Sequence, residues 1–230
     1  MPDINKLQKR IGYEFRDEGL LRTALTHSSY ASEHRMGYYE NNERLEFIGD
    51  AFVDAVVGVR LFEILDKSHE GVLSRYRADV VCEESLADAA EQIGLGKFLY
   101  LGKGEDAGGG RRKPSILSDA FEALMGAIIL DGGYEACRDV ILDILEKQIE
   151  LAADGRLSRD YKSRLQEHVQ EKDNTAKISY RIIDEQGPDH NKTFTVSVLI
   201  NNKVCGTGKG TSRARAEQAA AMEALSKGVL

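Results

Sequence analysis

The stretch NERLEFIGDAFVDAVVGV, residues 42–59, has the apolar spacing of a buried helix but also carries several acidic residues. Glu43, Glu46 and Asp50 stand at positions i, i+3 and i+7, which lie on one face of an α-helix. After Arg44 the stretch contains no Lys or Arg that could pair with these acids along the helix. The pattern therefore predicts a helix with an apolar body and an acidic face.

A second stretch, SILSDAFEALMGAIIL at residues 115–130, repeats this combination. Its two charged residues, Asp119 and Glu122, are both acidic and stand at i and i+3, so they share a helix face. A buried carboxylate is costly unless its pKa rises or a cation meets it, and oxygen ligands without a nearby His or Cys favour Mg²⁺ or Mn²⁺. The alternative is that each acid pair lies at the solvated edge of an amphipathic helix. Spacing alone leaves both interpretations open.

The rest of the chain predicts a helical domain followed by a small α+β domain. Apolar residues at three-and-four spacing predict helices over residues 5–11, 18–26, 42–62, 70–93, 115–131 and 135–151. The last third predicts helices over 161–170 and 212–226, and period-two strands through Ile178, Tyr180 and Ile182 and through Val196, Val198 and Ile200. We therefore expect an all-α domain over residues 1–151, a linker over 152–159, and an α-β-β-β-α domain over 160–228 with one sheet covered by two helices.

Two irregular segments have compositions that predict their structure. Asn201 and Asn202 separate the last two expected strands, and Asn tolerates the positive φ that a tight hairpin turn requires. LGKGEDAGGGRRKP, residues 101–114, is rich in Gly and predicts a mobile surface loop. Its basic run, residues 111–113, fits RNA contact and simple solvation equally well.

Charge is distributed unevenly between these two parts of the chain. Residues 1–155 hold 18 Lys and Arg against 29 Asp and Glu, a net charge of −11, whereas residues 156–230 hold 13 against 9, a net charge of +4. An acidic body that can hold cations and a basic domain that can meet phosphate indicate separate tasks.

Composition also excludes some classes of protein. We find no apolar run long enough to span a membrane and no apolar segment typical of a signal peptide near the first residue. The three cysteines, Cys82, Cys137 and Cys205, have no metal-ligand spacing and are odd in number. We therefore expect reduced thiols and a cytoplasmic protein.

The helical part resembles the catalytic domain of the ribonuclease III family. The resemblance rests on NERLEFIGD at 42–50, LTHSSY at 25–30, EGVLSRYRADVV at 70–81 and KPSILSDAFEALMGAIILDGGY at 113–134. It implies that Glu46, Asp50, Asp119 and Glu122 coordinate the catalytic Mg²⁺, for which Mn²⁺ can substitute, and that Glu43 and Glu70 are accessory acids in the same valley. It further implies a two-fold homodimer in which Phe47 enters a pocket of the partner subunit. One departure is Ser118, where the family pattern leads us to expect Ala.

The same resemblance implies the reaction. Each subunit would hydrolyse one strand of double-stranded RNA with metal-activated water, leaving 5′-phosphate and 3′-hydroxyl ends and a two-nucleotide 3′ overhang. The implied role is the processing of ribosomal and other structured RNA precursors. Two alternatives are a double-stranded RNA-binding protein that has lost catalysis and a metal-dependent hydrolase of another class.

The basic part resembles the double-stranded RNA-binding domain, through DYKSRLQEHVQ at 160–170, GPDHNKTF at 187–194 and GTGKGTSRARAEQAAAMEAL at 206–225. Such a domain touches two minor grooves of A-form RNA and the phosphates between them. The family usually has two adjacent lysines where this chain has Arg213 and Ala214, so Arg215 is a candidate replacement. The resemblance assigns the minor-groove contacts to Gln166, Glu167, Gln170 and His190, and the phosphate contacts to Lys209 and Arg213.

Overall fold

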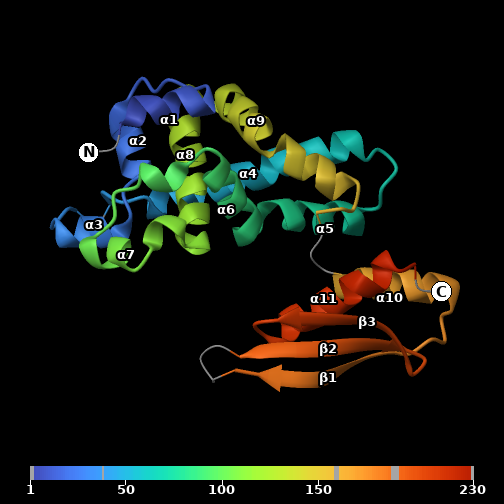
Figure 1. Cartoon of the computed structure of the whole chain (residues 1–230). Helices are drawn as coiled ribbons and strands as arrows, with labels where there is room; N and C mark the ends of the chain where they lie inside the picture. The colour runs from blue at the N-terminus through green and yellow to red at the C-terminus, as the bar shows by residue number, and fades with distance from the viewer. Residues whose placement is uncertain (1–2, 38, 158–160, 188–191, 229–230) are drawn as a thin grey trace. The chain divides into compact units, whose positions relative to one another are not determined.

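The computed structural model describes residues 3–37, 39–157, 161–187 and 192–228 (Figure 1). The chain divides into two compact units, Met1–Leu157 and Ser158–Leu230, and each is described by itself. None of the helices within the described residues is long and apolar enough to cross a membrane.

The first unit is built from helices around a central pair. Helix α8 packs along α4, and α2, α6 and α9 pack against α8. One continuous apolar core joins them and includes Leu61, Phe121 and Leu145, which are fully buried. The helices of this unit are α1 (Ile4–Ile11), α2 (Glu18–Ala24), α3 (Ser28–Glu33), α4 (Glu43–Ile64), α5 (Glu70–Val81), α6 (Glu83–Gln92), α7 (Lys103–Ala107), α8 (Pro114–Gly132) and α9 (Tyr134–Ala153), with 3₁₀ turns η1 (Leu95–Lys97) and η2 (Gly110–Arg112).

One helix prediction needs correction, and one helix was not predicted. The expected single helix over residues 70–93 is two helices, α5 and α6, because Cys82 has an extended backbone with ψ 156°. The break lets α5 pack against α4 and α9 while α6 packs against α8. Helix α3 was not expected; the imidazole of His27 caps it, since its Nδ1 accepts a hydrogen bond from the Ser29 amide at 3.2 Å.

The segment expected to be a mobile loop, residues 101–114, is held in place. It contains α7 and η2, and Arg111 ties it to the body of the unit. The Arg111 guanidinium donates to the carbonyl oxygens of Gly96 and Leu99 at 3.0 and 2.9 Å, and to the Asp106 carboxylate at 2.8 Å. Arg111 therefore has a structural role in this chain, which the sequence left undecided.

The second unit is the α-β-β-β-α domain that the sequence predicts. Strands β1 (Ile178–Gln186), β2 (Thr193–Ile200) and β3 (Lys203–Gly210) form an antiparallel sheet in the order β1-β2-β3. Helices α10 (Tyr161–Lys172) and α11 (Arg213–Ser226) cover one face of it (Figure 1). The hairpin at Asn201–Asn202 is confirmed, with φ values of 48° and 66° at the two asparagines.

Helix α9 extends two residues into the segment predicted as the linker. Helix α9 continues to Ala153 because Ala152 is fully buried in the helical core, and Gly155, at φ 66°, follows the helix end. Leu157 still packs against that core. The division between the two units therefore falls after Leu157, inside the predicted linker of residues 152–159.

Candidate active site

The position of the candidate site is set by a close crossing of helices α4 and α8. A Cβ atom on Gly49 would overlap the carbonyl oxygen of Glu122, and a Cβ atom on Gly126 would overlap the carbonyl oxygen of Leu45. Only glycine at both positions lets the two helix backbones touch. The crossing brings the acidic face of α4, beside Gly49, against the acidic face of α8, beside Gly126.

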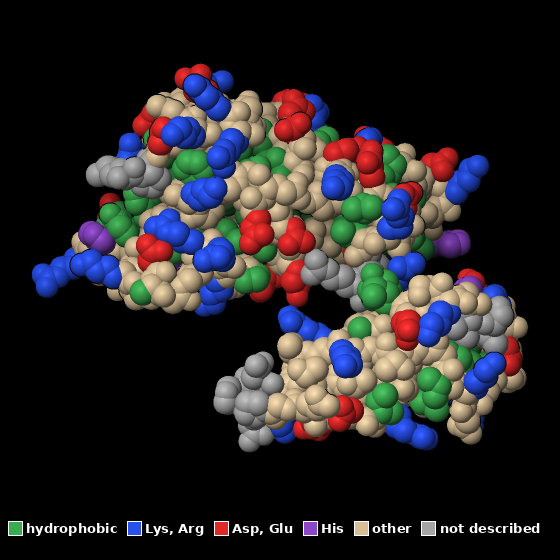
Figure 2. All heavy atoms as spheres, viewed as in Figure 1, with side chains coloured by type: hydrophobic (Ala, Val, Ile, Leu, Met, Phe, Trp, Pro, Cys, Tyr) green, Lys and Arg blue, Asp and Glu red, His purple; other side chains and the backbone are tan. Residues whose placement is uncertain are grey.

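Three acidic side chains meet at this crossing. Glu46 from α4 and Asp119 and Glu122 from α8 each offer a carboxylate oxygen, and these oxygens all lie within 4.8 Å of one another. All three residues are only partly exposed. Figure 2 shows acidic side chains gathered at the lower edge of the helical unit. We call Glu46, Asp119 and Glu122 the carboxylate cluster.

Two further acids act on the cluster through their charge. Asp50, one turn along α4 from Glu46, is exposed, and its charge raises the pKa of both Glu46 and Glu122. Glu43, at the first turn of α4, raises the pKa of Glu46 in the same way. Glu43 and Asp50 therefore stand at the border of the cluster. The family resemblance implied such a place for Glu43 as an accessory acid, but it counted Asp50 among the metal ligands, and Asp50 is not among the three acids whose oxygens meet here.

Burial and mutual repulsion raise the pKa values of the acids in the cluster. Burial, followed by the charges of Asp50, Glu46 and Asp119, raises the pKa of Glu122 to about 8. Burial also raises the pKa of Glu46 and of Asp119, although the Ser118 hydroxyl and the charge of His27 act against the shift at Asp119. Carboxylates that are crowded and half-buried repel one another when they are ionised, and a bound cation relieves this repulsion. An all-oxygen donor set fits a hard divalent ion such as Mg²⁺ or Mn²⁺.

Glu70 is not brought into the cluster by the single chain. It is the first residue of α5, where its carboxylate accepts a hydrogen bond from the Ser74 hydroxyl at 2.7 Å. Helix α5 begins beyond the far end of α4, and the 14 residues that follow Asp50, up to Ile64, span about 21 Å of helix. The sequence resemblance grouped Glu70 with the other acids, whereas within one subunit it stands apart from them.

Phe47 lies outside the core of its own subunit. Its side chain is 80% exposed, and in the sequence it lies between Glu46 and Asp50. Phe62 and Val59 on the same helix are 70% and 52% exposed. Together with the exposed Ala51 and Ala55 they form an apolar line along α4. We call these five residues, Phe47, Ala51, Ala55, Val59 and Phe62, the α4 stripe.

In the second unit, the predicted RNA contacts on the first helix are exposed. Gln166, Glu167 and Gln170 all lie on the exposed side of α10, and Leu165 and Val169 on its opposite side are fully buried. His190 lies outside the described residues.

The predicted phosphate contacts lie near the start of α11. Lys209 is exposed on β3, and Arg213 and Arg215 are exposed in the first turn of the helix. The Arg213 Nε atom donates to Glu217 at 2.8 Å, and the Lys162 ammonium group donates to the other carboxylate oxygen of Glu217 at 2.6 Å. Burial by itself would raise the pKa of Glu217, but these two hydrogen bonds hold it below its ordinary value. Glu217 therefore joins the beginnings of α10 and α11.

Sequence reasoning missed the residues that position the functional groups. The sequence did hold a signal for Gly49 and Gly126 as the point where two helices approach closely, because each is a glycine inside an apolar helix and lies within four residues of an acid. The sequence held no such signal for the ion pair between Lys162 and Glu217, since their pairing depends on how α10 and α11 pack.

Two family models match the chain. The family described as ribonuclease-III-like matches residues 17–149, and the double-stranded RNA binding motif matches residues 161–227. Ribonuclease 3 of Caldanaerobacter subterraneus subsp. tengcongensis is 52% identical over 97% of this chain and 97% of its own length. Ribonuclease 3 of Pelotomaculum thermopropionicum is 48% identical over 99% of this chain and 95% of its own length.

A solved structure agrees with the sequence relatives. The nuclease domain of ribonuclease III from Campylobacter jejuni has 46% sequence identity and a TM-score of 0.59, and the match covers 64% of this chain and 96% of that domain. With the carboxylate cluster at the α4–α8 crossing and an α-β-β-β-α domain following in the sequence, this chain belongs to the ribonuclease III family, as a catalytic domain followed by a double-stranded RNA-binding domain.

Proposed function

We propose that this protein is a Mg²⁺-dependent endoribonuclease that cuts both strands of double-stranded RNA. The carboxylate cluster carries the proposal, because three carboxylates with oxygens within 4.8 Å of one another repel when ionised, and a bound divalent cation relieves that repulsion. Glu46, Asp119 and Glu122 would hold the metal, and Asp50 at the border would complete the set. Mn²⁺, which prefers similar oxygen ligands, would replace Mg²⁺.

The chain's own residues would fix the geometry of hydrolysis. A bound divalent ion supplies a water of lowered pKa and neutralises negative charge on the phosphate oxygens. The glycine crossing keeps the carboxylates on two rigid helices, so their oxygens need no rearrangement when RNA arrives. Hydrolysis at the 3′ oxygen of the scissile phosphodiester would leave a 5′-phosphate on one product and a 3′-hydroxyl on the other.

The α4 stripe supports a two-fold homodimer. Large side chains such as Phe47 and Phe62 are 80% and 70% exposed in the single chain, and monomeric proteins rarely expose a continuous line of this kind. A structure of the Campylobacter jejuni nuclease domain is described as having a flexible region involved in dimer formation. Two subunits related by a two-fold axis would present two clusters, one for each RNA strand, and a staggered cut with a two-nucleotide 3′ overhang.

The second unit would hold the duplex. Its net positive charge, with Lys209, Arg213 and Arg215 exposed at one end of the domain, suits the phosphates of A-form RNA. Gln166, Glu167 and Gln170 would face one minor groove, and His190 is proposed for the other. Ribosomal precursors and other long structured transcripts are the proposed substrates in the cytoplasm.

The main alternative is a protein that binds double-stranded RNA without cutting it. The intact carboxylate cluster favours the enzyme, since a pure binding protein gains nothing from crowded, half-buried acids. Incubation with a long RNA duplex separates these functions. The enzyme should release short duplexes with Mg²⁺ and none with EDTA, whereas a binding protein would retain the intact duplex in both.

A further inference from the structure

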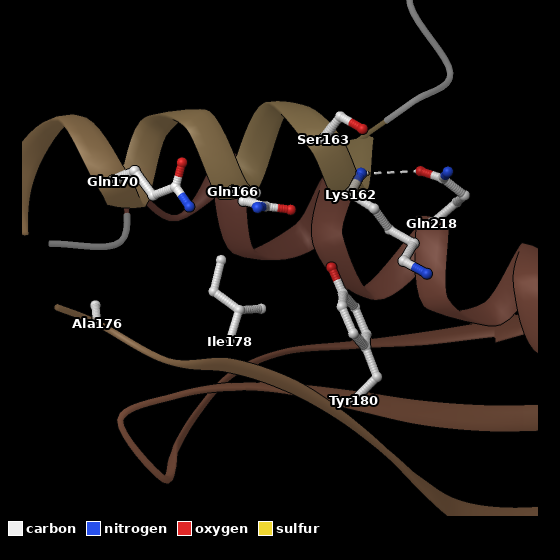
Figure 3. Close-up of a pocket in the computed structure, with 8 residues that line it drawn as sticks. All are labelled: Lys162, Ser163, Gln166, Gln170, Ala176, Ile178, Tyr180 and Gln218. Carbon is white, nitrogen blue, oxygen red and sulfur yellow. Dashed lines mark hydrogen bonds between the residues drawn. The ribbon is translucent and has the colours of Figure 1, made fainter. Parts of the chain in front are cut away.

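A cleft in the second unit begins at two of the residues proposed above for the minor groove, Gln166 and Gln170, and extends beyond them to residues that the proposed function does not use. It lies between α10 and the β1 side of the sheet and has a volume of about 430 Å³ (Figure 3). This volume falls in the range of small-ligand pockets. On one side stand Gln166 and Gln170 of α10, and across from them lie Ala176, Ile178 and Tyr180.

The walls of the cleft differ in chemistry. Gln166 and Gln170 are four residues apart, so their carboxamides lie one above the other along α10 and offer both hydrogen-bond donors and acceptors. Ala176 and Ile178 supply an apolar wall on the opposite side. A ligand suited to this cleft is flat, apolar on its face and polar along its edge.

The Tyr180 end of the cleft is fixed by neighbouring groups. The Lys162 ammonium group lies 5.0 Å from the centre of the Tyr180 ring and forms an ion pair with Glu217 at 2.6 Å. Because Glu217 already balances its charge, Lys162 at this end is not a strong site for a free anion. The cleft therefore favours an uncharged ring over a phosphate group.

We propose that this cleft receives an unpaired nucleobase that has left the stack of an RNA duplex, such as a single-nucleotide bulge. A nucleobase is flat, has hydrogen-bonding groups along its edge, and costs least to extrude when it has no pairing partner. Paired bases cannot enter a cleft, because their edges are engaged and the minor groove of A-form RNA is shallow. The proposal rests on duplex binding by this domain and adds a preference for irregular duplexes.

The test compares two duplexes of about 20 base pairs, longer than the ~16 base pairs that such a domain spans. One is fully paired, and the other carries one unpaired adenosine near its centre. Binding of the full chain is measured by fluorescence anisotropy in EDTA, so that nothing is cut. We expect the bulged duplex to bind about tenfold more tightly, the gain expected from one base held by stacking or hydrogen bonds.

Variants show whether the preference comes from the cleft. Gln166→Ala and Gln170→Ala, both at exposed positions, should bring the ratio of the two affinities close to one, whatever they do to the paired duplex alone. The matched control is Glu171→Gln, on the same helix but outside the cleft. It removes a negative charge and should strengthen binding of both duplexes, leaving their ratio unchanged.

A fluorescent base reports entry directly. With 2-aminopurine as the unpaired base, its emission should change on binding to the parent chain and not on binding to Gln170→Ala. Equal affinities for the two duplexes and unchanged emission would overturn the proposal while leaving duplex binding, and so the proposed function, intact. A chain that binds neither duplex would contradict the proposed function itself.

Discussion

Gly49 of α4 and Gly126 of α8 lie against each other, so that a Cβ atom on Gly49 would be 3.0 Å from the Gly126 amide nitrogen. The same Cβ atom would overlap the carbonyl oxygen of Glu122. Because both contacts are with backbone, no side-chain rotation can relieve them. The distance between the two acidic helices therefore depends on the absence of a methyl group at each of these two positions.

Gly49→Ala should force α4 and α8 apart and should lower both stability and cleavage. Overpacking of this kind costs about 1–3 kcal/mol of unfolding free energy. Gly58→Ala on the same helix is the matched control, since its Cβ atom would lie 3.5 Å from Arg77 Cδ, an ordinary contact. It should leave stability unchanged or raise it by about 0.5–1 kcal/mol. Urea unfolding measures the stability of each variant, and a cleavage assay measures its activity. If Gly49→Ala and Gly58→Ala had the same stability and the same cleavage rate, the role of the helix crossing would be contradicted.

The sequence predicted the extent of helices α4 and α8, but it did not predict that their acidic faces pack against each other. Periodicity alone located α4 and α8 to within one or two residues, with Glu46 and Glu122 on acidic faces, because 3.6-residue spacing is a local property. That the two faces converge follows from Gly49 and Gly126, whose contact is a tertiary fact. The family resemblance, rather than spacing, therefore decided between a metal site and a solvated edge.

Other differences also arise from packing. The break at Cys82 was invisible to periodicity, since the apolar spacing continues through it while the packing partners change from α4 and α9 to α8. The Gly-rich segment of residues 101–114 looked mobile because local composition does not reveal that Arg111 reaches the carbonyl oxygens of Gly96 and Leu99.

The stability of the metal-free protein should fall as the pH rises. In the folded chain the pKa of Glu122 is raised from 4.5 to about 8, so the folded state binds more protons than the unfolded state between these values. The stabilisation is complete below pH 4.5 and is lost as the pH rises through about 8. Glu46 and Asp119, whose pKa values are also raised, act in the same direction.

Glu122→Gln should weaken that slope, because the amide does not ionise. In EDTA at pH 8 the variant should be more stable than the parent by about 1–3 kcal/mol, less than the full pKa shift would give, because the Glu122 side chain is partly exposed and solvent screens its interactions. Saturating Mg²⁺ should reduce the difference, since the ion stabilises the ionised parent. Denaturant unfolding at several pH values measures how the free energy of unfolding changes with pH. If it changed equally with pH in parent and variant, the pKa of Glu122 would not be raised in the folded chain.

Phe47→Ala should shift the protein toward monomer in sedimentation. In the proposed dimer each subunit buries one such ring in the other, and truncating a buried Phe costs about 3–5 kcal/mol at each site. The staggered cut should be lost together with the dimer. Met222→Ala, which truncates another side chain exposed in the single chain, is the control and should leave assembly unchanged. A Phe47→Ala variant that remains dimeric at nanomolar concentration would remove Phe47 from the interface.

A chain ending at Leu157 should keep the carboxylate cluster and lose the basic unit. It should still cut duplex RNA at low salt and elevated Mg²⁺. Its activity should fail as salt rises, while the full chain remains active over a wider range, because contacts to phosphate carry the salt-sensitive part of affinity. Cleavage rates across a salt series give the comparison, and identical salt responses would mean that the second unit is not the main RNA-holding element.

Cleavage of a long RNA duplex by Glu122→Gln at saturating Mg²⁺ tests the central claim most directly. The amide keeps the volume of the side chain but is a poorer metal ligand, so cleavage should be nearly abolished while duplex binding and folding stay close to those of the parent. Asp143→Asn, at an exposed acid on α9, is the matched control and should cut at the parent rate. Cleavage by Glu122→Gln within about tenfold of the parent, a loss of no more than about 1.4 kcal/mol of transition-state stabilisation, would contradict the assignment of the carboxylate cluster as the metal centre.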